Sequence, residues 1–145
     1  MMDNRSRARE VALQVLFEAD LNKTPMSSAA AKAFIAQRLI NNRAMIEFCH
    51  TLIDGTRKNK ASIDQTIVAT AINWRLVRMM PADRNIMRLA SYELLHSPVN
   101  EPVQIVLNEA IELAKRFGSA DSASFVNGIL DKIAKLRPAI VVAPE

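Results

Sequence analysis

The sequence has few of the residues on which many common sites depend. Only three of its 145 residues are glycine, so it holds no glycine-rich phosphate loop. Its single cysteine, Cys49, excludes an internal disulfide bond. The two histidines, His50 and His96, lie far apart in the sequence. We therefore expect no metal site and no cofactor, and we interpret Cys49 as a packed thiol.

Long apolar runs are also missing. No run approaches the ~18 residues that a membrane-spanning helix needs. The start, "MMDNRSRAREVALQVLF", lacks the continuous apolar stretch of a signal peptide. We expect a cytoplasmic protein that does not contact a membrane. Half of the residues are hydrophobic, which suffices for one core, and the net charge of +4 permits contact with a polyanion.

Helical periodicity runs through almost the whole chain, and no strand-like alternation appears. The pattern predicts about seven helices, with Gly118 as a C-terminal cap. Their expected ranges are 4–21, 28–40, 42–60, 62–73, 83–96, 102–117 and 119–136. The fold class is therefore all-α, in one domain over 1–145. We expect two packed small helical bundles, at about 1–78 and 79–137, and a loose tail over 138–145.

Several carboxylates on the predicted helices raise the question of catalysis. Glu93 lies toward the apolar side of its helix, where it needs a donor such as an arginine from another helix. A structural ion pair is the simpler interpretation, and a catalytic carboxylate the alternative. We interpret Glu109 and Glu112 as a solvated face, with Glu112 and Arg116 as an i, i+4 ion pair. No histidine, serine or cysteine nucleophile stands beside them to complete a catalytic set.

Two short stretches are rich in basic residues. "NRSRARE" places Arg5, Arg7 and Arg9 within five residues. In a helix, Arg5 and Arg9 share a face and Arg7 points away, whereas in an extended segment all three can follow a phosphate backbone. The alternative is a solvated helix start. "RKNK", residues 57–60, has a simpler explanation, because cations are favourable at the end of a helix.

The stretch "GSADSASFVNGIL", residues 118–130, opens the last predicted helix. On a helical wheel, Val126 onward fills a core stripe, while Phe125 lies at its edge and Asp121 further out. The ring can complete the packing of the core, or it can stack on an unpaired base of single-stranded RNA. Asp121 would then accept hydrogen bonds from a base edge. The residues alone leave both interpretations open.

Three segments resemble one known family. "RAREVALQVLFEAD", "DRNIMRLASYELL" and "NEAIELAKRFGSADSASFVNGILDKIA" are similar, in order and spacing, to the bacterial NusB transcription antitermination factors. The resemblance implies an all-helical fold of two three-helix subdomains with an added helix, and no enzymatic activity. It implies binding of single-stranded boxA RNA together with NusE, which is also a small-subunit ribosomal protein. The partners would act with RNA polymerase in an antitermination complex that supports transcription of ribosomal RNA.

The resemblance also assigns roles to individual residues. It implies RNA contacts for Arg5, Arg7, Arg9, Asp121 and Phe125. It places Phe17 and Asp83 on the side that faces NusE. Ser6 interrupts the arginine run, since some members carry another arginine there.

Two other functions fit the same sequence. The chain can be the NusB-like RNA-binding portion of a ribosomal RNA cytosine methyltransferase, although it carries no methyl-donor site. It can also be a helical protein-interaction module that binds no RNA. Loss of RNA binding on substitution of Phe125 would separate the RNA-binding functions from the last one.

Overall fold

The computed structural model describes residues 4–72 and 75–138, and these residues form helices and no strand. The all-α prediction is confirmed. The seven α-helices and one short 3-10 helix are α1 (Asn4–Leu21), α2 (Ser28–Arg38), α3 (Arg43–Lys58), α4 (Lys60–Thr70), η1 (Leu76–Arg78), α5 (Pro81–Leu95), α6 (Val103–Phe117) and α7 (Ser122–Ala134). Within the described ranges, no helix combines the length and the apolarity that a membrane span requires.

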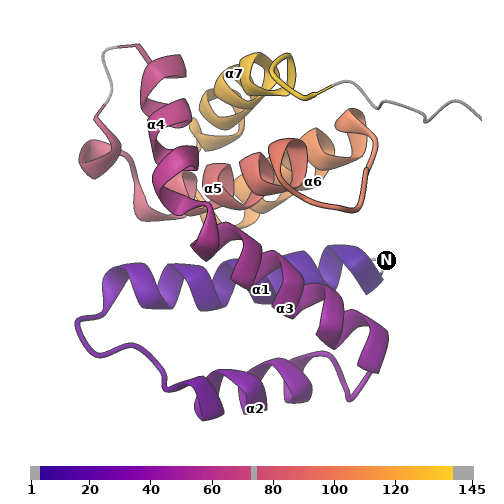
Figure 1. Ribbon diagram of the computed structural model, residues 1–145. Helices are drawn as coiled ribbons and strands as arrows, with labels where there is room; N and C mark the ends of the chain where they lie inside the picture. The colour runs from indigo at the N-terminus through magenta and orange to yellow at the C-terminus, as the bar shows by residue number, and fades with distance from the viewer. Residues whose placement is uncertain (1–3, 73–74, 139–145) are drawn as a thin grey trace, which may run out of the picture.

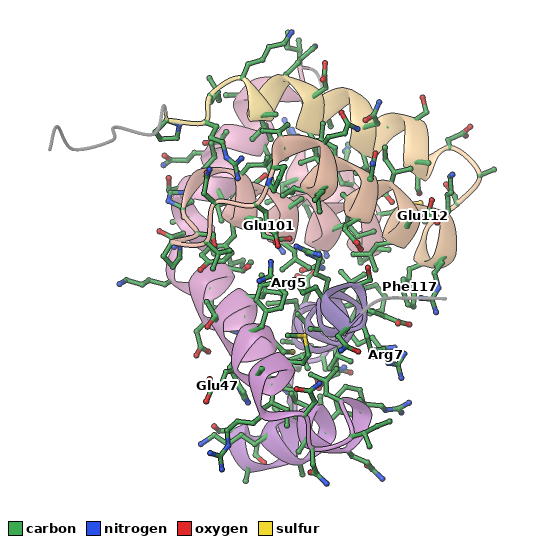
Figure 2. The ribbon with its side chains drawn as sticks, turned by 90° about the vertical axis from the view of Figure 1, so that its right-hand side faces the viewer. Arg5, Arg7, Glu47, Glu101, Glu112 and Phe117 are labelled. Carbon is green, nitrogen blue, oxygen red and sulfur yellow. The ribbon has the colours of Figure 1, made fainter. Side chains whose placement is uncertain are left out.

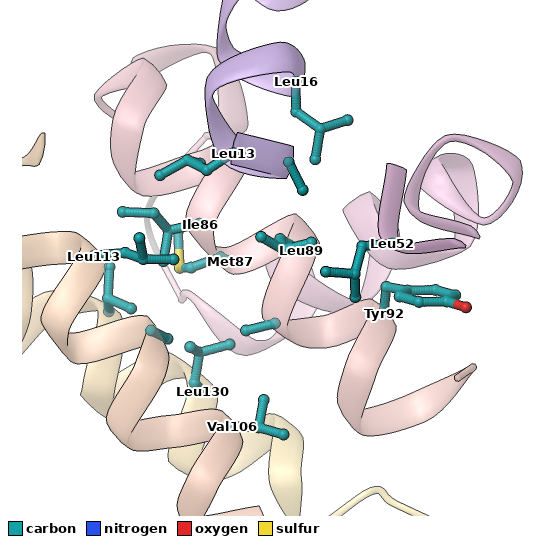
Figure 3. Close-up of a cluster of buried hydrophobic side chains, with 14 of the residues drawn as sticks. Leu13, Leu16, Leu52, Ile86, Met87, Leu89, Tyr92, Val106, Leu113 and Leu130 are labelled. Atoms are coloured by element: carbon teal, nitrogen blue, oxygen red, sulfur yellow. The ribbon is translucent and has the colours of Figure 1, made fainter. Parts of the chain in front are cut away.

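The helices pack as two groups around one core. Figure 1 shows α1, α2 and α3 on one side of the molecule and α4, α5, α6 and α7 on the other. Helix α5 contacts members of both groups: α1, α3, α4, α6 and α7. Side chains from both groups meet in the cluster of Figure 3, which includes Leu13, Leu52, Met87, Leu113 and Leu130. The expected division near residue 78 stays a prediction.

Helices α1 and α5 are the central elements. Residues 8–13 of α1 and residues 85–94 of α5 are buried without a break. An ordinary surface helix buries one stripe and exposes the other face. In these two helices the polar side chains of the inner turns are therefore buried too, and they need partners within the protein.

Most predicted helix boundaries lie within three residues of the observed ones. Helix α2 ends at Arg38, two residues before the predicted end, because Ile40 and Asn41 adopt positive φ angles of 52° and 54°. Helix α5 begins at Pro81, two residues early, since proline suits the first turn of a helix. The predicted end of the fourth helix at Asn73 lies outside the described residues, as does the predicted tail after residue 138.

Gly118 occupies the predicted capping position of α6. Glycine is usual there because the backbone is left-handed, but a different reason applies to Gly118. Its φ is −99°, which any residue can adopt. A Cβ atom at this position would clash with the Ser122 side chain and lie 2.7 Å from the carbonyl oxygen of Ala114. The Ser122 hydroxyl accepts a hydrogen bond from the Ser119 backbone at 2.8 Å. Helix α7 therefore begins at Ser122 and not at Ser119.

Cys49 lies on α3 in the core, with none of its surface exposed. Burial raises the pKa of its thiol to about 12. The interpretation of this residue as a packed thiol is confirmed.

Candidate nucleic-acid interface

The three arginines at the start of α1 have different environments. Arg9 is buried, with 2% of its side chain exposed. Its guanidinium donates three hydrogen bonds of 2.9–3.1 Å to the Glu93 carboxylate of α5. It also lies 3.5 Å from Glu101 and 3.7 Å from Glu109. We call these four residues the Arg9 cluster.

The predicted RNA contact of Arg9 needs correction. Its charge is already engaged by three carboxylates in the interior, so reaching a phosphate would leave buried carboxylates without a partner. The prediction for Glu93 is confirmed, since this buried carboxylate has an arginine from another helix as its donor. Glu93 has a structural partner near the start of α1, and only 4% of its side chain is exposed.

The Arg9 cluster holds more carboxylate than guanidinium. Burial raises the pKa of Glu93, and the nearby charges of Glu101 and Glu109 act in the same direction. The hydrogen bonds from Arg9 oppose this shift without cancelling it. Ser6 donates a hydrogen bond to Glu109, which was expected on a solvated face. The serine that interrupts the arginine run therefore has a structural partner.

Arg5 and Arg7 remain accessible, with 49% and 41% of their side chains exposed. Arg5 pairs with Glu101 and lies over the ring of Phe48, 5.3 Å from its centroid. Arg7 pairs with Glu10 at 2.9 Å. Figure 2, which looks onto the start of α1, shows Arg5 on the side of Glu101 and Arg7 on the other side of the helix. The predicted divergence of Arg7 from Arg5 is confirmed.

Asp121 and Phe125 lie at the start of α7. Asp121 is exposed, and its side chain makes no capping hydrogen bond to the helix. Its backbone carbonyl accepts the Phe125 amide at 3.1 Å, which fixes the ring one turn further along. Phe125 is partly buried against the core. An exposed carboxylate beside a half-buried ring presents both an acceptor and a stacking face.

The end of α6 links these two regions. Arg116 pairs with Glu10 at 2.8 Å, and not with Glu112 as expected. Its guanidinium also lies over the ring of Phe117, 5.3 Å from the centroid. Glu10 is thereby shared between Arg7 and Arg116, so the basic side chains continue from α1 to the last turn of α6. That turn leads through Gly118 to Asp121.

Phe17 and Asp83, the residues expected to face NusE, have different surroundings. Phe17 lines an apolar cavity of about 220 Å³ together with Leu13, Gln14, Ala82 and Phe117. Asp83 follows Ala82 but is itself buried, with 5% of its surface exposed. Its Oδ1 atom has no hydrogen-bond partner among the described residues. Direct contact of its carboxylate with a partner is therefore not available in this conformation.

Sequence reasoning missed three residues of this surface. Phe117 was expected in the core, yet 37% of it is exposed at the apolar cavity. Glu101 lies in a loop, where periodicity gives no indication of burial, although it is 8% exposed. Phe48 carries the guanidinium groups of Arg5 and Arg9 on its ring. The available signal in the sequence for the burial of Glu101 was its position directly before Pro102.

Sequence comparison matches residues 6–135 to the model of the NusB family. A transcription antitermination protein NusB from Elusimicrobium minutum is 47% identical over 137 residues, which cover 94% of this chain and 96% of that protein. One from Anaeromyxobacter dehalogenans is 41% identical over 138 residues and 95% of each chain. The resemblance seen in the sequence is therefore confirmed.

Solved structures give the same result. A crystal structure of T. maritima NusB superposes with a TM-score of 0.82 at 34% identity and covers 95% of this chain and 96% of the other. A chain from the complex of the antitermination factors NusB and NusE with double-stranded RNA superposes with a TM-score of 0.81 at 28% identity, covering 94% and 99%. With sequence and fold in agreement over nearly the whole chain, this protein belongs to the NusB family of transcription antitermination proteins.

Proposed function

We propose that this chain is an antitermination factor that binds single-stranded boxA RNA together with NusE. It would act in the cytoplasm, with RNA polymerase, during transcription of ribosomal RNA. The observation that carries the proposal is the close likeness to a NusB chain that is bound to NusE and RNA. The relatives are named as antitermination proteins and are matched over 95–96% of their length, which favours this function over the methyltransferase alternative.

The RNA surface of the proposal consists of Arg5, Arg7, Asp121 and Phe125. The two arginines supply phosphate contacts, because guanidinium groups donate two hydrogen bonds at once. Phe125 supplies a stacking face, and Asp121 an acceptor for a base edge. Arg9 leaves the predicted set and instead holds α1 against α5 and α6. With so few phosphate contacts, we expect weak binding to RNA alone.

The NusE surface of the proposal is the apolar cavity lined by Phe17 and Phe117. An apolar side chain of the partner would fill it, since exposed aromatic pockets are typical of binding hot spots. Asp83 contributes through the position of Ala82 and not through its own carboxylate. NusE binding would then add surface for the RNA, which couples the two affinities.

The test is boxA RNA binding with and without NusE over a range of salt concentrations. Phe125→Ala should weaken binding about tenfold through loss of stacking. The double variant Arg5→Gln/Arg7→Gln should reduce the slope of log affinity against log salt by about 2. Phe17→Ala should leave binding to RNA alone unchanged and abolish the gain that NusE provides.

Lys23→Gln is the matched control, since this exposed residue lies beyond the far end of α1 and should leave both affinities unchanged. If neither Phe125→Ala nor Arg5→Gln/Arg7→Gln affects RNA binding, the assigned RNA surface is wrong. If RNA does not bind even with NusE present, the interaction module without RNA becomes the better description.

A further inference from the structure

A second cavity, lined by charged residues, lies away from the proposed RNA and NusE surfaces. It has a volume of about 330 Å³ and is enclosed by the end of α1, the corner where α3 meets α4, and the first half of α5. Its lining residues are Leu16, Ala19, Asp20, Thr56, Arg57, Lys60, Asn85 and Arg88. This volume is within the ~300–1,000 Å³ of small-molecule binding pockets. None of these residues belongs to the proposed RNA surface or lines the Phe17 cavity.

The buried and half-buried charges behind this cavity balance one another. Arg88 donates two hydrogen bonds to the Asp64 carboxylate, at 2.8 and 3.1 Å. Asp20 accepts hydrogen bonds from Arg84 at 2.7 Å and from Asn85 at 2.9 Å. We call Arg84, Arg88, Asp20 and Asp64 the Arg88 cluster. Its two arginines match its two aspartates, so its net charge is zero.

Asp20 is the one carboxylate in the cavity wall, and its charge is already neutralised. Burial disfavours the charged form, but the hydrogen bonds from Arg84 and Asn85 outweigh burial and lower the pKa of this carboxyl. A second cation, Arg88, lies 3.7 Å from its other oxygen. An anion that enters the cavity would therefore meet a carboxylate whose field is largely cancelled by its partners.

The cations at the rim are in surplus. Arg57 and Lys60 are exposed, and within residues 4–72 and 75–138 neither has an ion-pair or hydrogen-bond partner for its side chain. They belong to the basic stretch "RKNK". Favourable placement at the end of α3 would explain Arg57 and Lys58 alike. It does not explain why Arg57 and Lys60 line the cavity while Lys58, between them, does not.

Two further donors are found at the same corner. Lys60 is the first residue of α4, an 11-residue helix whose N-terminus has no side-chain cap. The first amides of such a helix favour an anion. Thr56 lines the wall and is 2% exposed, and its Oγ1 has no hydrogen-bond partner in the described part of the chain. Rotation about χ1 can offer this hydroxyl to a ligand.

We propose that this corner is a phosphate-binding site, in which Arg57 and Lys60 bind the charged oxygens in front of a charge-balanced wall. The ligand class is a phosphate group, carried either by an RNA backbone or by a free small molecule. Apolar contacts from Leu16 and Ala19 would border the remainder of such a ligand. The proposal depends on none of the residues assigned to boxA or NusE binding.

The test is a titration of the isotope-labelled protein with inorganic phosphate, followed by amide NMR shifts, at an ionic strength held constant with sodium chloride. We expect shifts at residues 56–61 and at residues 85–88. The double variant Arg57→Gln/Lys60→Gln should raise the phosphate Kd about tenfold, because two charged contacts are lost. Lys58→Gln is the matched control and should bind as the unaltered protein does.

A second arm distinguishes the sources of phosphate. Single-stranded RNA that shifts the same amides, with a salt slope reduced by about 2 in the double variant, identifies an RNA backbone. Shifts with inorganic phosphate and a mononucleotide but not with RNA identify a small molecule. The proposal is overturned if no ligand shifts these amides, or if the double variant and Lys58→Gln respond equally. Thermal unfolding of each variant checks that these exposed substitutions leave the fold intact.

Discussion

The two ion clusters on α5 use the same residue types with opposite results. The Arg9 cluster, near the end of α5, gathers three carboxylates around one buried guanidinium, and Arg5 adds a second guanidinium at the surface. The Arg88 cluster, near the start of α5, sets two arginines against two aspartates. The first carries an excess of negative charge and the second carries none. Burial therefore acts on a net negative set of side chains in the Arg9 cluster and on a neutral set in the Arg88 cluster.

The difference shows in the direction of the pKa shifts. The pKa of Glu93 is raised by burial and by the neighbouring carboxylates. The pKa of Asp20 is lowered, because its hydrogen bonds from arginine and asparagine outweigh burial. The contribution of a salt bridge to stability thus differs from one site to another, and the net charge of the neighbouring groups decides its effect.

The largest expected effect comes from removing the guanidinium of the Arg9 cluster. Arg9→Met would leave Glu93 buried without its donor, which should lower the free energy of unfolding by about 3–5 kcal/mol. Urea unfolding measures this change. The double variant Arg9→Met/Glu93→Leu should recover most of the loss, and Arg7→Met, at an exposed position, should cost under about 1 kcal/mol. A small effect of Arg9→Met would show that the cluster contributes little to the fold.

The matching substitution in the Arg88 cluster should cost less. Arg88→Met removes two hydrogen bonds to Asp64, but 22% of that side chain is exposed and water can replace the donor in part. Asp20 keeps Arg84 and Asn85. We expect a loss of about 1.5–3 kcal/mol in the same urea measurement. A loss as large as that of Arg9→Met would contradict the contrast between the two clusters.

The two clusters should also respond to acid with opposite signs. The stabilising contribution of Asp20 is present above its unfolded pKa of about 4 and is lost as the pH falls through its lower folded value. Glu93 favours the folded state most below its unfolded pKa, and this contribution is lost as the pH rises through its higher folded value. Unfolding free energies measured against pH should therefore lose acid sensitivity in Asp20→Asn. Glu93→Gln should remove the opposite trend.

The smallest expected effect concerns RNA. Glu101 holds Arg5, which the proposed function needs for a phosphate contact. Glu101→Gln would remove this competition, and boxA affinity in the presence of NusE should rise about two- to threefold. Glu112→Gln, on an exposed acid paired with Lys115, serves as the control and should change little. Unchanged or weaker binding in Glu101→Gln would show that Arg5 is not limited by this pair.

The sequence predicted the helices well because their apolar spacing is regular, and it predicted a buried partner for Glu93. It failed where a helix is buried on all sides. On α1 and α5 no outer face exists for most turns, so a helical wheel could not show that Arg9 and Asp83 are buried. Phe117 lies on an ordinary amphipathic helix, yet its exposure depends on how α1 and α5 approach the end of α6. Such contacts between distant segments leave no periodic signal.

The buried thiol of Cys49 can serve as a chemical probe of local opening of the protein. A thiolate is the species that attacks a maleimide or a disulfide reagent, and a thiol with a pKa of about 12 supplies almost none at neutral pH. Because Cys49 is fully buried on α3, it can be alkylated only when the core around it opens. With no other cysteine in the sequence, the rate of alkylation reports how often this half of the molecule opens.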